Sequence, residues 1–255
     1  MRTLVIATMK GGVGKSATSH ALGVALARLG LRTLMIDMDP QSTLTQAAHG
    51  TVEDAQKNMV GVIGGRVKAA NTLLKIDENL ALLPSDIELA TMELELVAQM
   101  GRENVLKRAL KPLHRYFDVA IIDTAPSLGL LAVNALTAGD GVLIPTQPQV
   151  ADLRGLKLFL GTLDKVRDRL NPDLQTLGVL ITFYDGRLIH HRDAIDVLKE
   201  SDLPLLPIQI GRSIRVAEAA AAGESIITYD PTNKQAIAYQ TLAQGVEKWL
   251  KSAQR

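Results

Sequence analysis

A short segment near the start of the chain combines glycines with two lysines and a serine. It reads Lys10-Gly11-Gly12-Val13-Gly14-Lys15-Ser16 and continues into Ala17. Glycines permit positive φ angles and let backbone N–H groups approach an anion closely. A lysine followed by a hydroxyl residue supplies a cation for outer phosphates and an oxygen ligand for Mg²⁺. The segment therefore predicts a phosphate-binding loop with an associated magnesium ion.

The spacing of this loop departs from the usual phosphate-loop pattern at one position. Counting back from Gly14, the pattern places its first glycine where Met9 stands, and the loop carries the additional Lys10 instead. The alternative interpretation is a glycine-rich strand–helix turn that binds no ligand. Because Gly14-Lys15-Ser16 stands between a predicted strand and a predicted helix, the phosphate-binding loop is favoured.

Two carboxylate positions follow other predicted strands. Asp123 ends the apolar run 119–122, a pattern in which a buried strand delivers a carboxylate to Mg²⁺. Asp37 and Asp39 end another run, where a carboxylate can orient an attacking water; the family resemblance described below favours this role for Asp39, together with Ser16 and Asp123 as metal ligands. The alternative is that both aspartates cap the following helix, and for Asp37 structural support and function are equally open.

The elements that must hold these residues alternate between short apolar runs and longer helical patterns. Strands are predicted at residues 4–7, 33–36, 80–83, 119–122, 142–144, 177–182 and 205–210. Helices are predicted from the phosphate loop to residue 29, and over 86–100, 103–114, 152–170 and 234–250. Gly30 is expected to stop the first helix, and Ser85 or Asp86 to cap the second. This alternation predicts an α/β fold with a doubly wound, mostly parallel central sheet and helices on both faces.

No linker, internal repeat or low-complexity segment divides the sequence. Residues 1–255 are therefore predicted to form a single domain, which is an ordinary size for an α/β fold. Residues 50–79 are the least regular part, because Gly61, Gly64 and Gly65 interrupt any long helix there. We interpret this stretch as a variable insertion.

Composition limits the chemistry that the chain can perform. Lys and Arg number 28 and Asp and Glu 27, so the formal charge is 28 − 27 = +1, which argues against a surface coated in positive charge but not against a local basic patch. Cys is 0, which excludes disulfides, thiol nucleophiles and cysteine-ligated metal centres within this chain. Aromatic residues make up 3%, so a platform of rings that stacks bases is not expected. No segment has the pattern of a signal peptide or a membrane span, and a cytoplasmic location is expected.

The motifs together resemble the ParA family of deviant Walker-type ATPases, the group that includes MinD. The resemblance rests on the lysine-bearing loop 10–16, on Asp37-Met38-Asp39-Pro40-Gln41, and on Ile121-Ile122-Asp123-Thr124-Ala125-Pro126-Ser127. Tyr184-Asp185-Gly186-Arg187 and the later segments 214–219 and 229–231 also fit, so the resemblance covers nearly the whole chain. It implies a P-loop NTPase fold that binds ATP and Mg²⁺.

The resemblance also implies a cycle controlled by the nucleotide. ATP is expected to bring two copies of the chain face to face, with Lys10 reaching the partner's nucleotide as an arginine finger does. Lys15 is expected to act on the outer phosphates within its own chain, and Asp39 to orient the water. Hydrolysis is then slow until an activator, a ParB-like protein or a cargo adaptor, completes the site.

Partition members of the family bind double-stranded DNA without sequence preference as ATP-bound dimers, which would make this protein nucleoid-associated. The resemblance assigns this contact to Arg187 and Arg215, and the neighbouring Arg212 extends the patch. Such contacts go to phosphates, so binding is expected to fall steeply with salt. The alternative is that these arginines are ordinary solvated charges.

The sequence departs from the family pattern in two places. Where some relatives carry an adenine-recognising Asn, this chain reads Ile181-Thr182-Phe183, and we expect base contacts through backbone groups near Pro207 instead. A helix-turn-helix extension is not expected, since nine residues precede Lys10.

Two other functions fit the same scaffold. A MinD-like positioning ATPase needs a membrane-binding amphipathic tail, and residues 246–251 contain a Trp, a Leu and lysines. We expect instead that Tyr239, Leu242, Val246, Trp249 and Leu250 dock this tail on the sheet, without membrane contact. A small-molecule phosphotransferase is the remaining alternative, but no second substrate constellation is visible.

Overall fold

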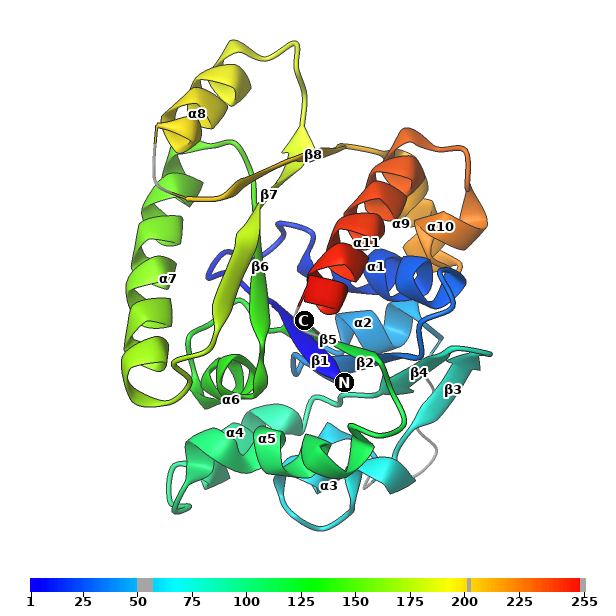
Figure 1. Cartoon of the computed structure of the whole chain (residues 1–255), viewed down its shortest axis with the longest axis vertical. Coiled ribbons are helices and arrows are strands. Elements are labelled where there is room, and N and C mark those ends of the chain that lie inside the picture. The colour runs from blue at the N-terminus through cyan, green and yellow to red at the C-terminus, as the bar shows by residue number, and fades with distance from the viewer. Residues whose placement is uncertain (50–56, 201–202, 253–255) are drawn as a thin grey trace.

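The predicted strands lie side by side in one sheet of a computed structural model, which describes residues 1–49, 57–200 and 203–252. The eight strands described have the order β3-β4-β2-β5-β1-β6-β7-β8, as Figure 1 shows. Their bounds are β1 (Arg2–Ile6), β2 (Thr33–Met38), β3 (Leu74–Asp77), β4 (Leu80–Leu83), β5 (Val119–Thr124), β6 (Gly141–Thr146), β7 (Gln175–Tyr184) and β8 (Leu205–Gly211). All neighbouring pairs are parallel except β3 with β4, so the doubly wound, mostly parallel sheet is confirmed.

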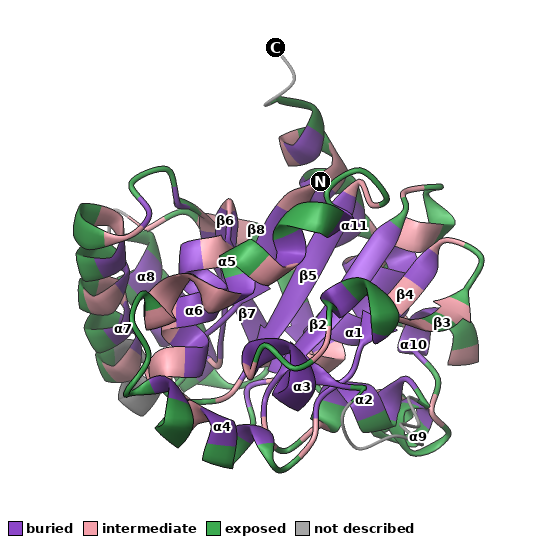
Figure 2. Cartoon of the chain, turned by 90° about the horizontal axis from the view of Figure 1, so that it is seen from below, coloured by how far each residue is buried: buried purple, intermediate pink, exposed green. Residues whose placement is uncertain are grey.

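Helices cover both faces of this sheet. One face carries α1 (Lys15–Arg28), α2 (Thr43–Ala47), α9 (Ile214–Ala221), α10 (Ile226–Tyr229) and α11 (Lys234–Ser252). The other carries α3 (Met59–Ile63), α4 (Leu89–Leu96), α5 (Val105–Leu110), α6 (Leu130–Ala138), α7 (Val150–Arg169) and α8 (Ile189–Lys199). Three short 3₁₀ turns, η1 (Ala69–Asn71), η2 (Arg102–Asn104) and η3 (Lys111–Leu113), lie among the second group. The central strands are buried between these layers, as Figure 2 shows.

Two predicted helices are shorter than the sequence pattern suggested. The prediction over 86–100 is wrong at both ends, because α4 begins at Leu89 and ends at Leu96. Asp86 accepts a bond from the backbone N–H of Glu88 in a turn before the helix, and the Ser85 hydroxyl donates to the carbonyl of Asp39, so neither caps it. After Leu96 the chain continues in tighter i→i+3 bonds.

The helix predicted over 103–114 is broken into three pieces, η2, α5 and η3. Pro112 stands in the last of them and has no backbone N–H, so the α-helical ladder ends at Leu110. Strand β3 was not predicted, because its side chains alternate between half-buried and exposed on an outer antiparallel strand rather than forming an apolar run. Helices α6, α8 and α9 also lie in stretches for which no element was predicted.

The predicted insertion at 50–79 lies partly outside the described residues, which resume at residue 57. From there the chain forms α3, η1 and β3. Met59, Val60, Val62 and Ile63 are buried in the same core cluster as α4 and α6. The described part of the stretch is therefore packed into the main core.

The parallel arrangement brings the predicted chemical residues to one edge of the sheet. Strands β1, β2 and β5 are neighbours, and their carboxyl ends lead into the phosphate loop, the Asp39 turn and the loop after Asp123. Asp37 of β2 stands directly opposite Asp123 of β5 in the register. This edge is the place where α/β proteins of this class bind ligands.

Candidate functional site

The loop between β1 and α1 has the backbone geometry that anion binding requires. Gly12 and Gly14 adopt left-handed φ values of 70° and 83°, and Gly14 stands immediately before the first residue of α1. A Cβ at Gly12 would meet no atom within 4 Å, so its backbone conformation, not crowding, demands glycine. The N-terminus of α1 adds unpaired N–H groups and a positive dipole end beside the loop.

Lys15 is held inside this loop. Its side chain is buried, and its Nζ donates to the backbone carbonyl of Lys10 over 3.2 Å. Burial lowers the pKa of Lys15, while the nearby carboxylates of Asp123 and Asp39 act in the opposite direction. A buried ammonium with two acidic neighbours and a carbonyl is positioned to exchange that carbonyl for a phosphate.

Asp123 is the most deeply buried carboxyl group of the site. Its Oδ1 accepts a bond from the Ser19 hydroxyl at 3.0 Å, whereas its buried Oδ2 accepts none within the described residues. Burial raises the pKa of Asp123 to about 7, with the nearby Asp37 adding to the rise and the Ser16 and Ser19 hydroxyls opposing it. A buried carboxylate oxygen without a hydrogen-bond partner is costly, and it fits the role of a cation ligand.

The two aspartates of the second strand have different surroundings. Asp37 is fully buried and accepts three bonds, from the backbone N–H of Asp39 and from both the N–H and the hydroxyl of Thr45. Burial raises the pKa of Asp37 to about 6 in spite of these bonds. Asp39 lies at the end of the strand and accepts a bond from the N–H of Gln41. Asp37 thus anchors the turn and the start of α2, and Asp39 stands at its tip.

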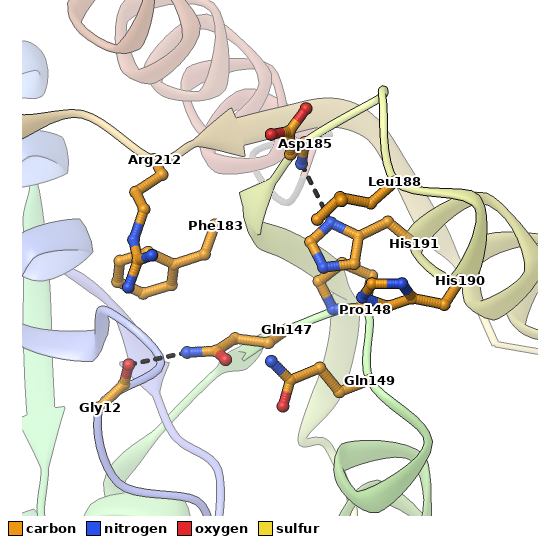
Figure 3. Close-up of a pocket in the computed structure, with 10 residues that line it drawn as sticks. All are labelled: Gly12, Gln147, Pro148, Gln149, Phe183, Asp185, Leu188, His190, His191 and Arg212. Atoms are coloured by element: carbon orange, nitrogen blue, oxygen red, sulfur yellow. Dashed lines mark hydrogen bonds between the residues drawn. The ribbon is translucent and has the colours of Figure 1, made fainter.

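A cavity of about 480 Å³ opens beside the phosphate loop (Figure 3). Its wall includes Gly12, whose carbonyl accepts a bond from Gln147 Nε2 at 2.9 Å. Gln149, also on the wall, accepts a bond from Lys10 Nζ at 3.3 Å. Phe183 contributes its ring and adopts a left-handed φ of 52°, which is uncommon for a bulky residue. The cavity therefore joins the loop to the ends of β6 and β7.

The donor set fits magnesium better than a transition metal. Among the residues that the structure describes, no three His, Asp or Glu side chains gather as a metal-ligand cluster. Mg²⁺ takes one or two carboxylates, retains waters and fills its shell with phosphate oxygens. Asp123 with its unpartnered Oδ2, and the Ser16 hydroxyl next to it, match that requirement.

The three predicted DNA-binding arginines do not lie in one environment. Arg187 is exposed and pairs with Asp185 at 2.7 Å. Arg215 pairs with Glu218 at 2.9 Å and with Asp230 at 3.4 Å. Arg212 instead lines the cavity beside the phosphate loop. Pro207, the predicted neighbour of the base, is exposed within strand β8 and does not line that cavity.

Sequence reasoning missed several residues that the fold brings to the site. Ser19 lies one helical turn after Ser16 and Lys15, and this spacing places a second hydroxyl on the same helix face. Gln147 and Gln149 follow a predicted strand in a stretch that the sequence marks only as rich in Pro and Gln. Their contacts with the loop come from the neighbouring positions of β1 and β6, which no local pattern specifies.

Residues 1–176 match a family model described as an AAA domain. The sporulation initiation inhibitor protein Soj of Bacillus subtilis is 38% identical over 247 residues, covering 96% of this chain and 98% of the relative. The chromosome partitioning protein ParA of Myxococcus xanthus is 37% identical over 253 residues, covering 97% and 88%. The chain belongs to the ParA family of ATPases.

Solved structures agree with this placement. A cobyrinic acid a,c-diamide synthase from Mycobacterium smegmatis, with ADP and magnesium bound, is 38% identical with a TM-score of 0.87, covering 99% of this chain and 96% of that one. A Cyanothece McdA variant in complex with ATP is 28% identical with a TM-score of 0.86, covering 97% and 96%. The P-loop NTPase fold that the ParA resemblance implied is thereby confirmed.

The tail expected to dock on the sheet does so. Tyr239, Leu242, Val246 and Leu250 of α11 are buried in the core cluster that includes α1, and Trp249 packs against it. The Trp249 ring lies under the Arg2 guanidinium and donates to Gln175. None of the described helices is long and apolar enough to cross a membrane.

Proposed function

We propose that this chain is an ATP-dependent dimerising ATPase that partitions or positions DNA or a cargo complex. It acts as a single ATPase domain, binds DNA without sequence preference as an ATP-bound dimer, and hydrolyses ATP slowly until an activator stimulates it. This activity places it in the cytoplasm, associated with the nucleoid. The observation that carries the proposal is the unpartnered, buried Oδ2 of Asp123 beside Ser16 and Lys15.

The nucleotide site follows from these groups. Residues 11–17 would surround the phosphates with backbone N–H groups, and Lys15 would turn its ammonium from the Lys10 carbonyl to the outer phosphates. Ser16, Asp123 and Asp39 would hold Mg²⁺, which neutralises charge on the phosphate oxygens when bound. The M. smegmatis structure, which contains ADP and magnesium, and the Cyanothece structure, which contains ATP, support this assignment.

Asp39 and Lys10 are assigned to hydrolysis. Asp39 stands at the tip of a turn whose shape Asp37 fixes, so its carboxylate is positioned to orient a water. Lys10 lies on the outer part of the loop and bonds to Gln149, whereas Lys15 is directed inward. One lysine therefore serves its own nucleotide and the other is placed for a second chain.

The base is assigned to the end of β7. The Phe183 ring lies 3.5 Å from the position that a Cβ on Gly14 would occupy, and Arg212 lines the same cavity. A flat ring and a planar guanidinium beside the phosphate loop suit an adenine face. Pro207 lies within β8 and does not line this cavity. We therefore propose Phe183 and Arg212 for base contact.

DNA contact is assigned to Arg187 and Arg215. Each guanidinium is exposed and pairs with a carboxylate of its own chain, at Asp185 and at Glu218. Exposed pairs of this kind contribute little free energy, so a DNA phosphate competes for the arginine at small cost. A dimer doubles the number of such arginines and thereby raises the apparent affinity.

The burial of the tail bears on the membrane alternative. The apolar side of α11 is occupied by the core of its own chain, and membrane binding would require that side to leave it. We therefore propose that the ATP-bound dimer binds DNA and not a membrane.

One similar structure is named a cobyrinic acid a,c-diamide synthase, so diamide synthesis is the competing activity. Such a reaction needs a second substrate site and a source of ammonia, which glutamine-hydrolysing enzymes commonly generate with a cysteine thiol. This chain contains no cysteine. The ATPase cycle therefore accounts for more of its residues.

Light scattering of the purified chain tests the proposed cycle. With Mg·ATP and the Asp39→Ala variant, which should slow hydrolysis, the mass is expected to double relative to ADP. A mass that stays monomeric with ATP, at concentrations where ATP is bound, would contradict the proposal.

A further inference from the structure

A second cavity lies away from the nucleotide site. Helices α3 and α5 lie side by side on one face of the sheet (Figure 1), and a cavity of about 440 Å³ opens between them. None of the phosphate-loop residues, and none of the residues lining the cavity of Figure 3, contributes to it. The two cavities therefore share no lining residue.

One wall of this cavity comes from α5 and the 3₁₀ turn that follows it. Val105, Arg108, Ala109 and Pro112 line it, at the i, i+3, i+4, i+7 spacing of a single stripe along α5 and η3. The opposite wall comes from the end of α3 and the turn after it, with Ile63 among its members. A row of residues at helical spacing that faces a largely apolar wall offers a second helix a groove to pack into.

The cavity is large enough for several apolar side chains. A cavity of about 150 Å³ lined by apolar residues admits one benzene-sized group. The cavity of about 440 Å³ therefore holds two or three side chains of that size. Two leucines four residues apart on an incoming helix match this number.

The charges around the cavity are of one sign. Lys68 and Arg108 line it, and no acidic residue is among the described residues that do so. Lys107 and Lys111 are exposed on the neighbouring stripe of the same helix. The acidic groups nearby are already engaged, since Glu95 pairs with Arg66 and Glu103 with Arg102.

Among the residues that the structure describes, these cations have no carboxylate partner. Within the described ranges 57–200 and 203–252, none of Lys68, Lys107, Arg108 and Lys111 forms an ion pair, and Arg108 donates only to the carbonyl of Gly101. In a chain with a formal charge of +1, such a concentration on one surface is a local excess. It would attract an acidic partner and repel a basic one.

We propose that the cavity between α3 and α5 docks an acidic amphipathic helix of a partner protein. Its leucine-like side chains fill the cavity, and its carboxylates lie against Lys68 and Arg108. The site goes beyond the ATPase cycle proposed above, because it gives the chain a protein contact that needs neither nucleotide nor DNA.

Fluorescence anisotropy with the full chain tests this proposal. The probe is a fluorescein-labelled helical peptide of about 14 residues with two leucines four apart among glutamates, and its counterpart carries lysines for the glutamates. The acidic peptide is expected to bind with a Kd on the order of 10 μM, and the basic one at least about tenfold more weakly. Equal binding of the two peptides, or no binding of the acidic one, overturns the proposal.

Three variants separate the cavity from general electrostatic attraction. The double variant Lys68→Glu, Arg108→Glu should raise the Kd of the acidic peptide at least about tenfold. The control Lys157→Glu, Lys165→Glu on α7 should change this Kd less than about twofold. Ala109→Trp fills the cavity without changing charge and should abolish binding. If Ala109→Trp binds normally, the contact is a surface attraction and the cavity is not the site. All variants should bind ATP as the parent chain does, so failure here stays distinct from failure of the ATPase proposal.

The absence of cysteine permits a direct check of position. Ala70 lines the cavity, and Ala70→Cys would be the sole thiol of the chain. A peptide whose cysteine, in place of one leucine, is activated as a mixed disulfide with 2-nitro-5-thiobenzoate should exchange with Ala70→Cys, releasing the thiobenzoate, at least about tenfold faster than with a Thr162→Cys control on α7. Equal rates at the two positions would place the peptide elsewhere.

Discussion

The ammonium of Lys15 donates a hydrogen bond to the backbone carbonyl of Lys10, 3.2 Å away within the same loop. The side chain of Lys10 turns outward to Gln149 while that of Lys15 turns inward toward Asp123. The two lysines of the loop thus point in different directions. The ammonium of Lys15 now bonds to a backbone carbonyl, and we expect it to bond to a phosphate when nucleotide binds. This division assigns different consequences to losing each lysine.

Replacing Lys15 with alanine should strongly weaken ATP binding. The ammonium is the buried cation of the loop, and a charge-assisted contact to a phosphate contributes about 2–3 kcal/mol, so the Kd for a fluorescent ATP analogue should rise by about 100-fold. Because burial lowers the pKa of Lys15, its removal should not lower the free energy of unfolding. The exposed Lys165→Ala serves as the control, and near-normal affinity of Lys15→Ala would refute the loop assignment.

Replacing Lys10 with alanine should leave ATP binding by the monomer within about threefold of the parent chain, because the inner cation remains. The ATP-dependent dimer and its turnover should be lost, as measured by light scattering and phosphate release. Gln149→Ala is the matched control, since it removes the partner of Lys10 and keeps the ammonium. A normal dimer with normal turnover in Lys10→Ala would remove this lysine from the mechanism.

Replacing Asp39 with alanine should trap the ATP state. Turnover is expected to fall by about 100-fold, the range typical of losing a general base, while ATP affinity persists. Asp37→Ala behaves differently, because it orphans three hydrogen bonds at a buried turn and should cost about 2–3 kcal/mol of folding free energy. Unchanged phosphate release by Asp39→Ala would argue decisively against its role.

The raised pKa of Asp123, about 7, gives the nucleotide-free chain a defined pH dependence. Below the ordinary range near 4 both folded and unfolded chains are protonated, and as pH rises toward 7 the unfolded chain releases its proton first, so stability falls. Asp123→Asn removes this contribution. In urea denaturation at about pH 8 its free energy of unfolding should exceed that of the parent by about 1–2 kcal/mol, and the two should differ little at about pH 4.

The comparison between these two chains removes the contribution of titrating groups that do not interact with Asp123. Asp37, whose pKa is raised to about 6, also makes stability fall as pH rises. Burial lowers the pKa of His20 from 6.5 to about 4, so His20 makes stability rise with pH over that interval. His20 is present in both chains and cancels to first order, whereas Asp37 contributes to the raised pKa of Asp123 and is part of the difference. A difference between parent and variant that does not grow with pH would contradict the assigned environment of Asp123.

Reversing Arg215 to glutamate should weaken DNA binding without changing ATP turnover in the absence of DNA. Losing one phosphate contact per protomer removes two per dimer and should lower both the affinity and the slope of its salt dependence. Glu218→Gln frees Arg215 from its nearer carboxylate and should strengthen DNA binding modestly. If Arg215→Glu retains DNA normally at low salt, the contact lies elsewhere.

The sequence predicted the elements with strong local patterns. The apolar runs around Ile36 and Ile122 became buried parallel strands, and the positive-φ Gly30 ended the first helix where expected. The outer strand β3 has half its side chains exposed and gave no apolar run, so it was missed. Pro112 divided a helix that periodicity alone would have continued.

The site was predictable where one segment carried it and less so where several meet. The loop 10–16 and Asp123 could be placed because each stands directly after an apolar strand. Gln147, Phe183 and Arg212 come together through the order of β1, β6, β7 and β8, which depends on long-range packing. For the same reason the sequence did not predict that Arg212 lines this cavity, which neither Arg187 nor Arg215 does.

Retention of double-stranded DNA by the purified chain, compared with Mg·ATP, with Mg·ADP and without nucleotide, tests the central claim most directly. We predict retention of unrelated DNA sequences with Mg·ATP at low salt, strongest for Asp39→Ala, and loss of retention with ADP, without nucleotide or in Lys10→Ala. Retention that is equal in all three nucleotide conditions, or absent with ATP while the dimer forms, would contradict an ATP-switched DNA-binding cycle.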